Sequence, residues 1–234
     1  ALPISRMEQV RQWLWDHGRR IVDTAVAQAR RAAPEVEVAD SLVAGDPVPA
    51  LLAAAQDAEL LVVASQSGGR LTDLLLGSVT RKMVVQAACP VVVVRHDMPP
   101  ERVFGEVVVG VDGSGPAQAA LRFAVEEAAL RGARLRVILA WRSPFPAAAE
   151  PPPVFVDMLE LEAAEEWALT EAVRPYADSH PQVEIVRQLV AGHPVEALVQ
   201  AATTADLLVV GSRGRGAMTG PLLGSVSQGV LHHA

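Results

Sequence analysis

The sequence is poor in cysteine and in positive charge, and it lacks long apolar runs. Its one cysteine, Cys89, cannot form a disulfide within the chain, so a disulfide-built secreted domain is not expected and a reducing cytoplasm fits. The formal net charge of −7 argues against the electrostatic contacts that sequence-independent nucleic-acid binders use. No uninterrupted apolar run reaches the roughly 18 residues of a membrane-spanning helix. We therefore expect a cytoplasmic protein that binds neither nucleic acid nor membranes.

Several enzyme motifs are also missing. Lys82 is the only lysine, so the second half has no lysine for a Gly-x4-Gly-Lys-Ser/Thr loop. There is no Gly-x-Ser-x-Gly elbow, and no Gly-x-Gly-x-x-Gly follows an expected strand. The six histidines do not have the spacing of a metal site. These absences disfavour a P-loop enzyme, a serine hydrolase, a dinucleotide site and a histidine metal centre.

The sequence does contain an internal repeat with an offset of 147 residues. Residues 42–79 and 189–226 align without a gap, and 23 of these 38 positions are identical. A repeat this long indicates a duplicated domain rather than a solenoid unit. We place the domains at 1–98 and 99–234, because Pro99 and Pro100 exclude regular helix at the junction.

Strand and helix patterns alternate in both domains. In the first domain we expect helices at 7–32, 48–55 and 78–87 and strands at 36–43, 60–63 and 91–94. In the second we expect strands at 107–111, 135–141, 183–190 and 207–210 and helices at 117–130, 156–176, 195–203 and 225–232. This alternation predicts an α/β fold of two tandem, doubly wound, Rossmann-like parallel sheets with strand order 3-2-1-4-5.

Both predicted sheets are incomplete in the sequence. The first domain lacks a counterpart of strand 107–111, and the second lacks a counterpart of strand 91–94. In a doubly wound sheet the first strand is central, and its loss would leave buried backbone groups unpaired. We therefore expect the native protein to be longer at both ends.

The segment 211–227 carries the chemistry. It runs from the end of an expected strand, through a glycine-rich loop, to the start of a helix, which is the edge where α/β sheets bind ligands. Glycines let the backbone approach a phosphate, and a helix start offers free N–H groups and a positive dipole end. Ser225 and Ser227 are candidate hydroxyl donors, and Arg213 and Arg215 are candidate positive charges. The alternative is that the glycines only form a tight strand-to-helix turn.

This loop resembles that of the ATP-binding universal stress proteins, which carry Gly-x2-Gly-x9-Gly-Ser/Thr. Gly211, Gly214, Gly224 and Ser225 match the motif residue by residue, and the segment 108–114 resembles the family's opening strand and turn. The resemblance implies that Asp112 lies beside the nucleotide, that main-chain atoms of Ala140 contact adenine, and that the loop 190–194 lies near the site. It also implies a role in stress adaptation, a homodimer and a regulatory protein partner.

The candidate nucleotide-binding residues of the second domain are Gly110, Asp112, Ser114, Ala140, Gly192, Gly211, Arg213, Gly214, Arg215, Gly216, Gly224, Ser225, Val226 and Ser227. Asp112 is also the candidate ligand of a magnesium ion held with the phosphates, although it could simply cap the following turn. In the first domain, Ala64 and Ser67 replace the first two glycines of the motif. The candidates there are Gly45, Gly68, Gly69, Arg70, Gly77, Ser78, Val79 and Thr80.

Three functions remain open from these residues. The first is an ATP-dependent regulatory module of the stress response. The second is a slow ATP hydrolase, for which Asp112 is the one candidate base. The third is an interaction scaffold without nucleotide. The carboxylates of Glu160, Glu162, Glu165 and Glu166 are expected on a solvated helix face. The four tryptophans, Trp13, Trp15, Trp141 and Trp167, are expected to be packing residues.

Overall fold

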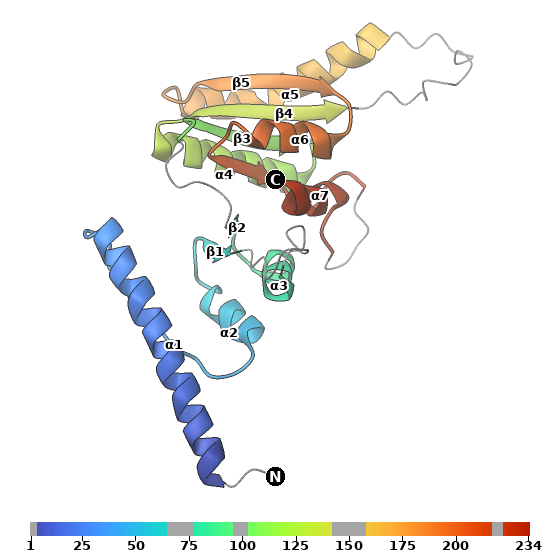
Figure 1. Ribbon diagram of the computed structural model, residues 1–234. Helices are drawn as coiled ribbons and strands as arrows, with labels where there is room; N and C mark the ends of the chain where they lie inside the picture. Colours follow the sequence, from blue (N-terminus) through green and yellow to red (C-terminus); the bar gives the residue numbers. More distant parts are fainter. Residues whose placement is uncertain (1–3, 65–76, 96–102, 142–157, 217–221) are drawn as a thin grey trace. The chain divides into compact units, whose positions relative to one another are not determined.

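The computed structural model describes residues 4–64, 77–95, 103–141, 158–216 and 222–234 (Figure 1). The chain forms two compact units, Ala1–Ala53 and Ala54–Ala234, which are described here one at a time. The predicted domain junction at residues 98 and 99 lies outside the described residues.

The first unit is helical. It contains α1 (Ile4–Ala32) and most of α2 (Pro47–Ala54). Side chains one turn apart support α1, as where Arg19 Nε donates to Asp23 Oδ1 at 2.8 Å, and Arg30 and Arg31 lie in the last turn, near the negative end of the helix dipole. Asp46 begins α2 by accepting the N–H of Val48 on its Oδ1 at 2.9 Å.

The second unit begins with β1 (Leu61–Ala64), α3 (Ser78–Gln86) and β2 (Val91–Val94). The two strands pair in parallel, with Leu61 opposite Val91 and Ala64 opposite Val94. A helix between two parallel strands is the expected βαβ arrangement.

The rest of the second unit has a four-stranded parallel sheet. Its elements are β3 (Glu106–Val111), α4 (Gly115–Arg131), β4 (Arg134–Trp141), α5 (Met158–Ser179), β5 (Ile185–Ala191), α6 (Pro194–Ala202), β6 (Leu207–Val210) and α7 (Ser225–His233). The strands lie in the order β5-β4-β3-β6. The predicted parallel α/β fold is confirmed, and these strands occupy positions 3-2-1-4 of the predicted order; the fifth position stays a prediction.

Helices bury both faces of this sheet (Figure 1). Val107 and Val109 of β3 pack on the α4 and α5 side with side chains such as Leu121 and Leu169. Val108, between them, packs on the other face with residues of α6 and α7. Because successive strand side chains point to opposite faces, an uninterrupted valine run suits a strand covered on both sides.

One predicted strand, at 36–43, is not formed, and that prediction is wrong. Its counterpart in the second domain, β5, pairs with β4 from Leu135↔Ile185 to Trp141↔Ala191. The repeat offset places the counterpart of β4 before residue 1 of the printed sequence. A strand forms only with a partner to accept its backbone hydrogen bonds, and the predicted partner is not in the sequence.

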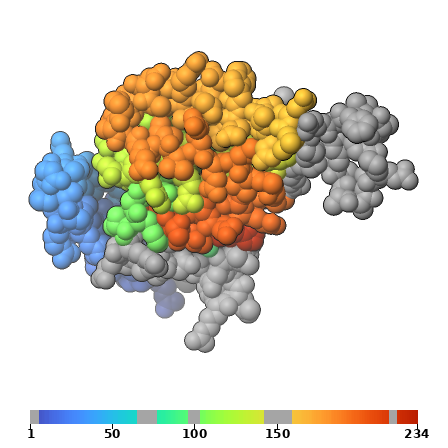
Figure 2. Space-filling model, turned by 90° about the horizontal axis from the view of Figure 1, so that it is seen from above, coloured from blue at the N-terminus to red at the C-terminus, as the bar shows by residue number. Residues whose placement is uncertain are grey.

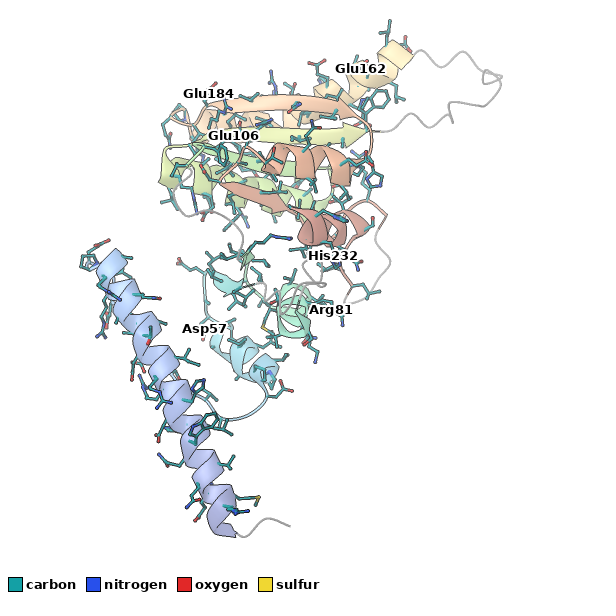
Figure 3. The ribbon with its side chains drawn as sticks, viewed as in Figure 1. Asp57, Arg81, Glu106, Glu162, Glu184 and His232 are labelled. Carbon is teal, nitrogen blue, oxygen red and sulfur yellow. The ribbon has the colours of Figure 1, made fainter. Side chains whose placement is uncertain are left out.

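The amino-terminal edge of the four-stranded sheet is closed by carboxylates. Asp206 accepts the N–H groups of Phe104 and Gly105 at 2.7 Å and that of Glu106 at 3.2 Å. Glu106, labelled in Figure 3, is buried and forms ion pairs with Arg134, whose Nε lies 2.6 Å from its Oε1, and with Arg136. The side chains at this edge are therefore used in structural hydrogen bonds and ion pairs, whereas a cavity lies at the carboxyl edge.

Candidate functional site

A cavity of about 760 Å³ opens at the carboxyl edge of the four-stranded sheet. The ends of β3, β4 and β6, the loop after β6 and the first turn of α7 line it, together with residues of α5 and α6. The structure brings together all the second-domain candidates here except Ser114 and Gly192. The candidates that line the cavity are Gly110, Asp112, Ala140, Gly211, Arg213, Gly214, Arg215, Gly216, Gly224, Ser225, Val226 and Ser227.

Three motif glycines lie where a side chain would not fit. A Cβ on Gly211 would lie 2.8 Å from the carbonyl carbon of Pro116, and one on Gly214 would lie 2.5 Å from Asp112 Oδ2. A Cβ on Gly224 would lie 3.2 Å from the Cα of Arg213. These glycines therefore let the loop pack against the start of α4 and fold back on itself, which is a structural need for small residues.

The start of α7 faces the cavity without a side-chain cap. Gly224 is its N-cap residue and carries no side chain that could accept a hydrogen bond from the first turn. Gln228 N donates to Gly224 O at 2.9 Å, so the N–H groups of Ser225, Val226 and Ser227 precede the helical hydrogen-bond pattern. Such N–H groups, with the positive end of the helix dipole, favour an anion.

The hydroxyl of Ser227, which was predicted to be a donor to a ligand, instead donates to the main chain. Ser227 is 4% exposed, and its Oγ donates to the carbonyl oxygen of Gly211 at the end of β6. In the first domain, Thr80 is 5% exposed and its Oγ1 donates to Ala64 O at 3.1 Å. These positions are equivalent in the repeat, so this buried hydroxyl ties the helix start to the strand end in both domains. As a phosphate ligand, Ser227 would have only its main-chain N–H to offer.

Asp112 joins the two loops at the carboxyl edge. Its Oδ1 accepts the N–H of Ser114 at 2.9 Å, and its Oδ2 accepts the N–H of Arg215 at 2.9 Å. Burial raises the pKa of Asp112, but hydrogen bonds from Ser114 and Arg215 and the positive charge of Arg215 outweigh it and lower the pKa below 3.8. An ionised carboxylate therefore holds the loop after β6 against the turn after β3.

No group of three or more potential metal ligands of the His, Cys, Asp and Glu types occurs within the described part of the chain. Asp112 already accepts a main-chain N–H on each oxygen. The described residues therefore do not offer a magnesium ion a full set of protein ligands, and an ion beside Asp112 would also need phosphate oxygens and water.

A candidate residue that the sequence analysis missed is Glu165. Its side chain is 23% exposed and lines the cavity, with Oε1 4.0 Å from Arg215 Nη1. The prediction of a solvated face is therefore wrong for Glu165, whereas Glu160, Glu162 and Glu166 are exposed as expected. Residues 161, 165, 169 and 173 recur every four positions, and an acidic residue inside this otherwise apolar stripe is the signal that could have revealed it.

The end of β4 supplies main-chain groups to the cavity. β3 pairs with β4 only as far as Val111↔Leu139, so Ala140 and Trp141 extend beyond β3. Both line the cavity, and Trp141 also packs against the core, as predicted. The packing prediction is wrong for Trp13, Trp15 and Trp167, whose side chains are exposed. Leu161 of α5 adds a further apolar wall that the sequence analysis did not identify.

The two candidates outside the cavity have structural tasks. The N–H of Gly192 donates to Trp141 O at 3.0 Å, and Ser114 caps α4 by accepting the N–H of Ala117 at 3.4 Å. Gly192 has φ 146 and its counterpart Gly45 has φ 134, so the repeated loop has the same backbone in both domains. His193 and Asp46 follow these glycines, and each caps the next helix.

The first domain repeats the backbone geometry found at the start of α7. Gly77 precedes α3 with φ −56 and ψ 148, close to the φ −65 and ψ 154 of Gly224, and again without a side-chain cap. Ser78, Val79 and Thr80 form the first turn of α3. Gly68, Gly69 and Arg70 lie outside the described residues.

Within the described residues, no helix has the length and apolar content needed to cross a membrane. The fold and the site together define a doubly wound parallel α/β protein with a cavity at the carboxyl edge of its sheet. The universal stress protein family matches residues 2–95 and again 104–234. The chain belongs to the universal stress protein family, as two tandem domains.

Individual relatives agree with this assignment. A universal stress protein of Mycobacterium tuberculosis (strain ATCC 25618 / H37Rv) is 38% identical over 227 residues, which is 95% of this chain and 76% of that protein. The crystal structure of a universal stress protein from Archaeoglobus fulgidus DSM 4304 covers 100% of this chain and 77% of its own, with 21% identity and a TM-score of 0.66, and shows the shared fold. A universal stress protein crystallised in complex with cAMP is 33% identical over 55% of this chain and 90% of its own, with a TM-score of 0.42.

Proposed function

We propose that the second domain binds ATP in the cavity at the carboxyl edge of its sheet, and that the protein is an ATP-dependent regulatory module of the stress response. The observation that carries the proposal is the uncapped start of α7, which opens into a cavity of about 760 Å³. This volume falls within the range of about 300 to 1,000 Å³ that small-ligand sites occupy. Membership of the universal stress protein family supports the biological role.

The two ends of a nucleotide have matching surroundings in the cavity. The phosphates would lie at the N–H groups of Ser225, Val226 and Ser227, where main-chain donors and the helix dipole favour negative charge. Adenine would lie against the end of β4. There Ala140 has no pairing partner in β3, and the side chains of Trp141 and Leu161 supply apolar surface.

The charged residues that line the cavity would not by themselves neutralise a bound triphosphate. Among the described lining residues, the positive charges of Arg213 and Arg215 are balanced by the negative charges of Asp112 and Glu165, so their formal side-chain charges sum to zero. A triphosphate would then be compensated mainly by the α7 N–H groups and by magnesium. We propose that magnesium, when present, is held mainly by phosphate oxygens and water, because the described residues contain no group of three or more protein ligands.

We favour a regulatory module over a slow ATP hydrolase. A general base must reach the proton that it abstracts, and Asp112, the one candidate, is committed to the loop N–H groups with a lowered pKa. Regulation requires that ATP bind two states of the protein with different affinities, which a partner could then distinguish. We further propose a cytoplasmic homodimer with a protein partner, on family resemblance, and a second ATP position at the start of α3.

The experiment is to purify the protein from cells, denature it and identify the nucleotide released. ATP in the supernatant supports the regulatory module, and ADP alone would favour hydrolysis. If no nucleotide is released and added ATP does not bind, the chain is a scaffold and the proposal fails.

A further inference from the structure

Glu165 is the acidic group of the cavity that does not hold the loops together. Among the described residues that line the cavity, Asp112 and Glu165 are the acidic ones. Asp112 accepts a main-chain N–H on each oxygen. Glu165 Oε1 lies 4.0 Å from Arg215 Nη1, which is longer than a hydrogen bond. Its carboxylate therefore keeps acceptor capacity that a ligand could use.

Glu165 and the start of α7 come from helices on opposite faces of the sheet. Helix α5 packs on one face of the sheet through Leu169 and Val173, whereas α7 packs on the other face through Val230. The yellow and orange residues of α5 form part of the outer surface of the domain in Figure 2. Since both helices contribute to one cavity, a nucleotide with its phosphates at α7 would present another part of itself to α5.

The chemistry of a carboxylate limits what that part can be. Glu165 repels phosphates and accepts hydrogen bonds from neutral donors. An adenine nucleotide has two kinds of neutral donor, which are the amino group of the base and the hydroxyls of the sugar. The base amino group has the main chain of Ala140 as its partner in the proposed pose. The hydroxyls remain for Glu165.

We propose that Glu165 accepts hydrogen bonds from the ribose hydroxyls of the bound nucleotide, and so makes the site selective for ribonucleotides over deoxyribonucleotides. This inference rests on the proposed ATP site. Arg215, whose side chain is 59% exposed, is the positive group beside Glu165. A hydroxyl bonded to a charged acceptor contributes strongly to discrimination, because the deoxy analogue leaves the acceptor unpaired.

The test compares the dissociation constants of ATP, 2′-deoxy-ATP and 2′,3′-dideoxy-ATP by titration calorimetry, in the purified protein and in two variants. We expect the unaltered protein to prefer ATP over 2′-deoxy-ATP by about tenfold. Glu165→Gln should bring the ratio close to one, chiefly by weakening ATP. The matched control is Glu162→Gln, which removes an exposed charge from the same helix (Figure 3) and should keep the ratio.

The outcomes separate this inference from the proposed function. An unchanged ratio in Glu165→Gln, no preference for ribose in the unaltered protein, or tighter ATP binding in Glu165→Gln would each overturn the role of Glu165 while leaving the ATP site intact. An equal loss of selectivity in Glu162→Gln would also overturn it. No binding of ATP to the unaltered protein would overturn the proposed function itself.

Discussion

A buried hydroxyl in the first turn of the helix makes the same kind of hydrogen bond in both domains. Ser227 donates to Gly211 O and Thr80 to Ala64 O, so serine and threonine serve equally at this position. We predict that Ser227→Ala lowers the free energy of unfolding by about 1–2 kcal/mol, because a buried carbonyl oxygen loses its donor. Urea unfolding measures this loss, and Ser227→Thr should retain most of the stability.

The same pair of variants tests which role the hydroxyl has. If Ser227→Ala unfolds at the urea concentration of the unaltered protein but binds ATP much more weakly, the hydroxyl is a phosphate ligand and the structural assignment is wrong.

The lowered pKa of Asp112 leads to a prediction about how the stability of the protein depends on pH. Its native pKa is lowered, so folding favours the ionised form. The stability that it supplies is complete above the unfolded value of 3.8 and is lost as the pH falls through the lower native value. Asp112→Asn should therefore be less stable than the unaltered protein at neutral pH, and this difference should shrink below pH 3.8.

Thermal unfolding of both proteins between pH 3 and pH 7 measures the difference, and the pairing isolates Asp112 from the other carboxylates. A difference that grows toward low pH would mean that the native pKa of Asp112 is raised, against the assignment of its hydrogen bonds.

At the scale of elements, the contact between the end of β6 and the start of α4 depends on Gly211. A Cβ there would lie 2.8 Å from the main chain of Pro116, which cannot move without shifting α4. We predict that Gly211→Ala costs about 1–3 kcal/mol of unfolding free energy, the usual cost of overpacking. The control is Gly216→Ala, since a Cβ on Gly216 meets no described atom within 4 Å. Equal stability of the two variants in urea would contradict this packing.

Elements with a periodic pattern and a partner in the chain could be predicted from the sequence. The valine run at 107–111 and the strand at 207–210 were found because buried parallel strands need uninterrupted apolar residues. The predicted strand at 36–43 has apolar residues interrupted by Glu37, Asp40 and Ser41, and it has no neighbouring strand among the described residues. The pattern alone does not reveal whether a partner strand is present. We attribute the absence of this strand to the missing partner strand.

The glycine-rich part of the candidate site could also be predicted, because loop, strand end and helix start are contiguous in the sequence. Glu165 and Leu161 could not be placed, because they reach the cavity only through the packing of α5 on the sheet. Likewise, the sequence shows Ser227 beside the motif but does not show that its hydroxyl is already bonded to Gly211 O.

At the scale of the whole molecule, duplication supplies an internal control. Gly77 and Gly224 precede equivalent uncapped helices, α3 and α7, with closely similar φ and ψ. A substitution at one position can therefore be matched by the same substitution at the other. Among the described atoms, the nearest to a Cβ on Gly77 is Thr80 Oγ1 at 3.9 Å.

The most direct test of the ATP site is a calorimetric titration of the unaltered protein, Gly224→Glu and Gly77→Glu with ATP. We predict that Gly224→Glu abolishes binding to the second domain, because it places a carboxylate at the start of α7, where the phosphates would lie. Gly77→Glu should leave that binding in place. Undiminished affinity and stoichiometry in Gly224→Glu, with the variant folded by circular dichroism, would contradict the account.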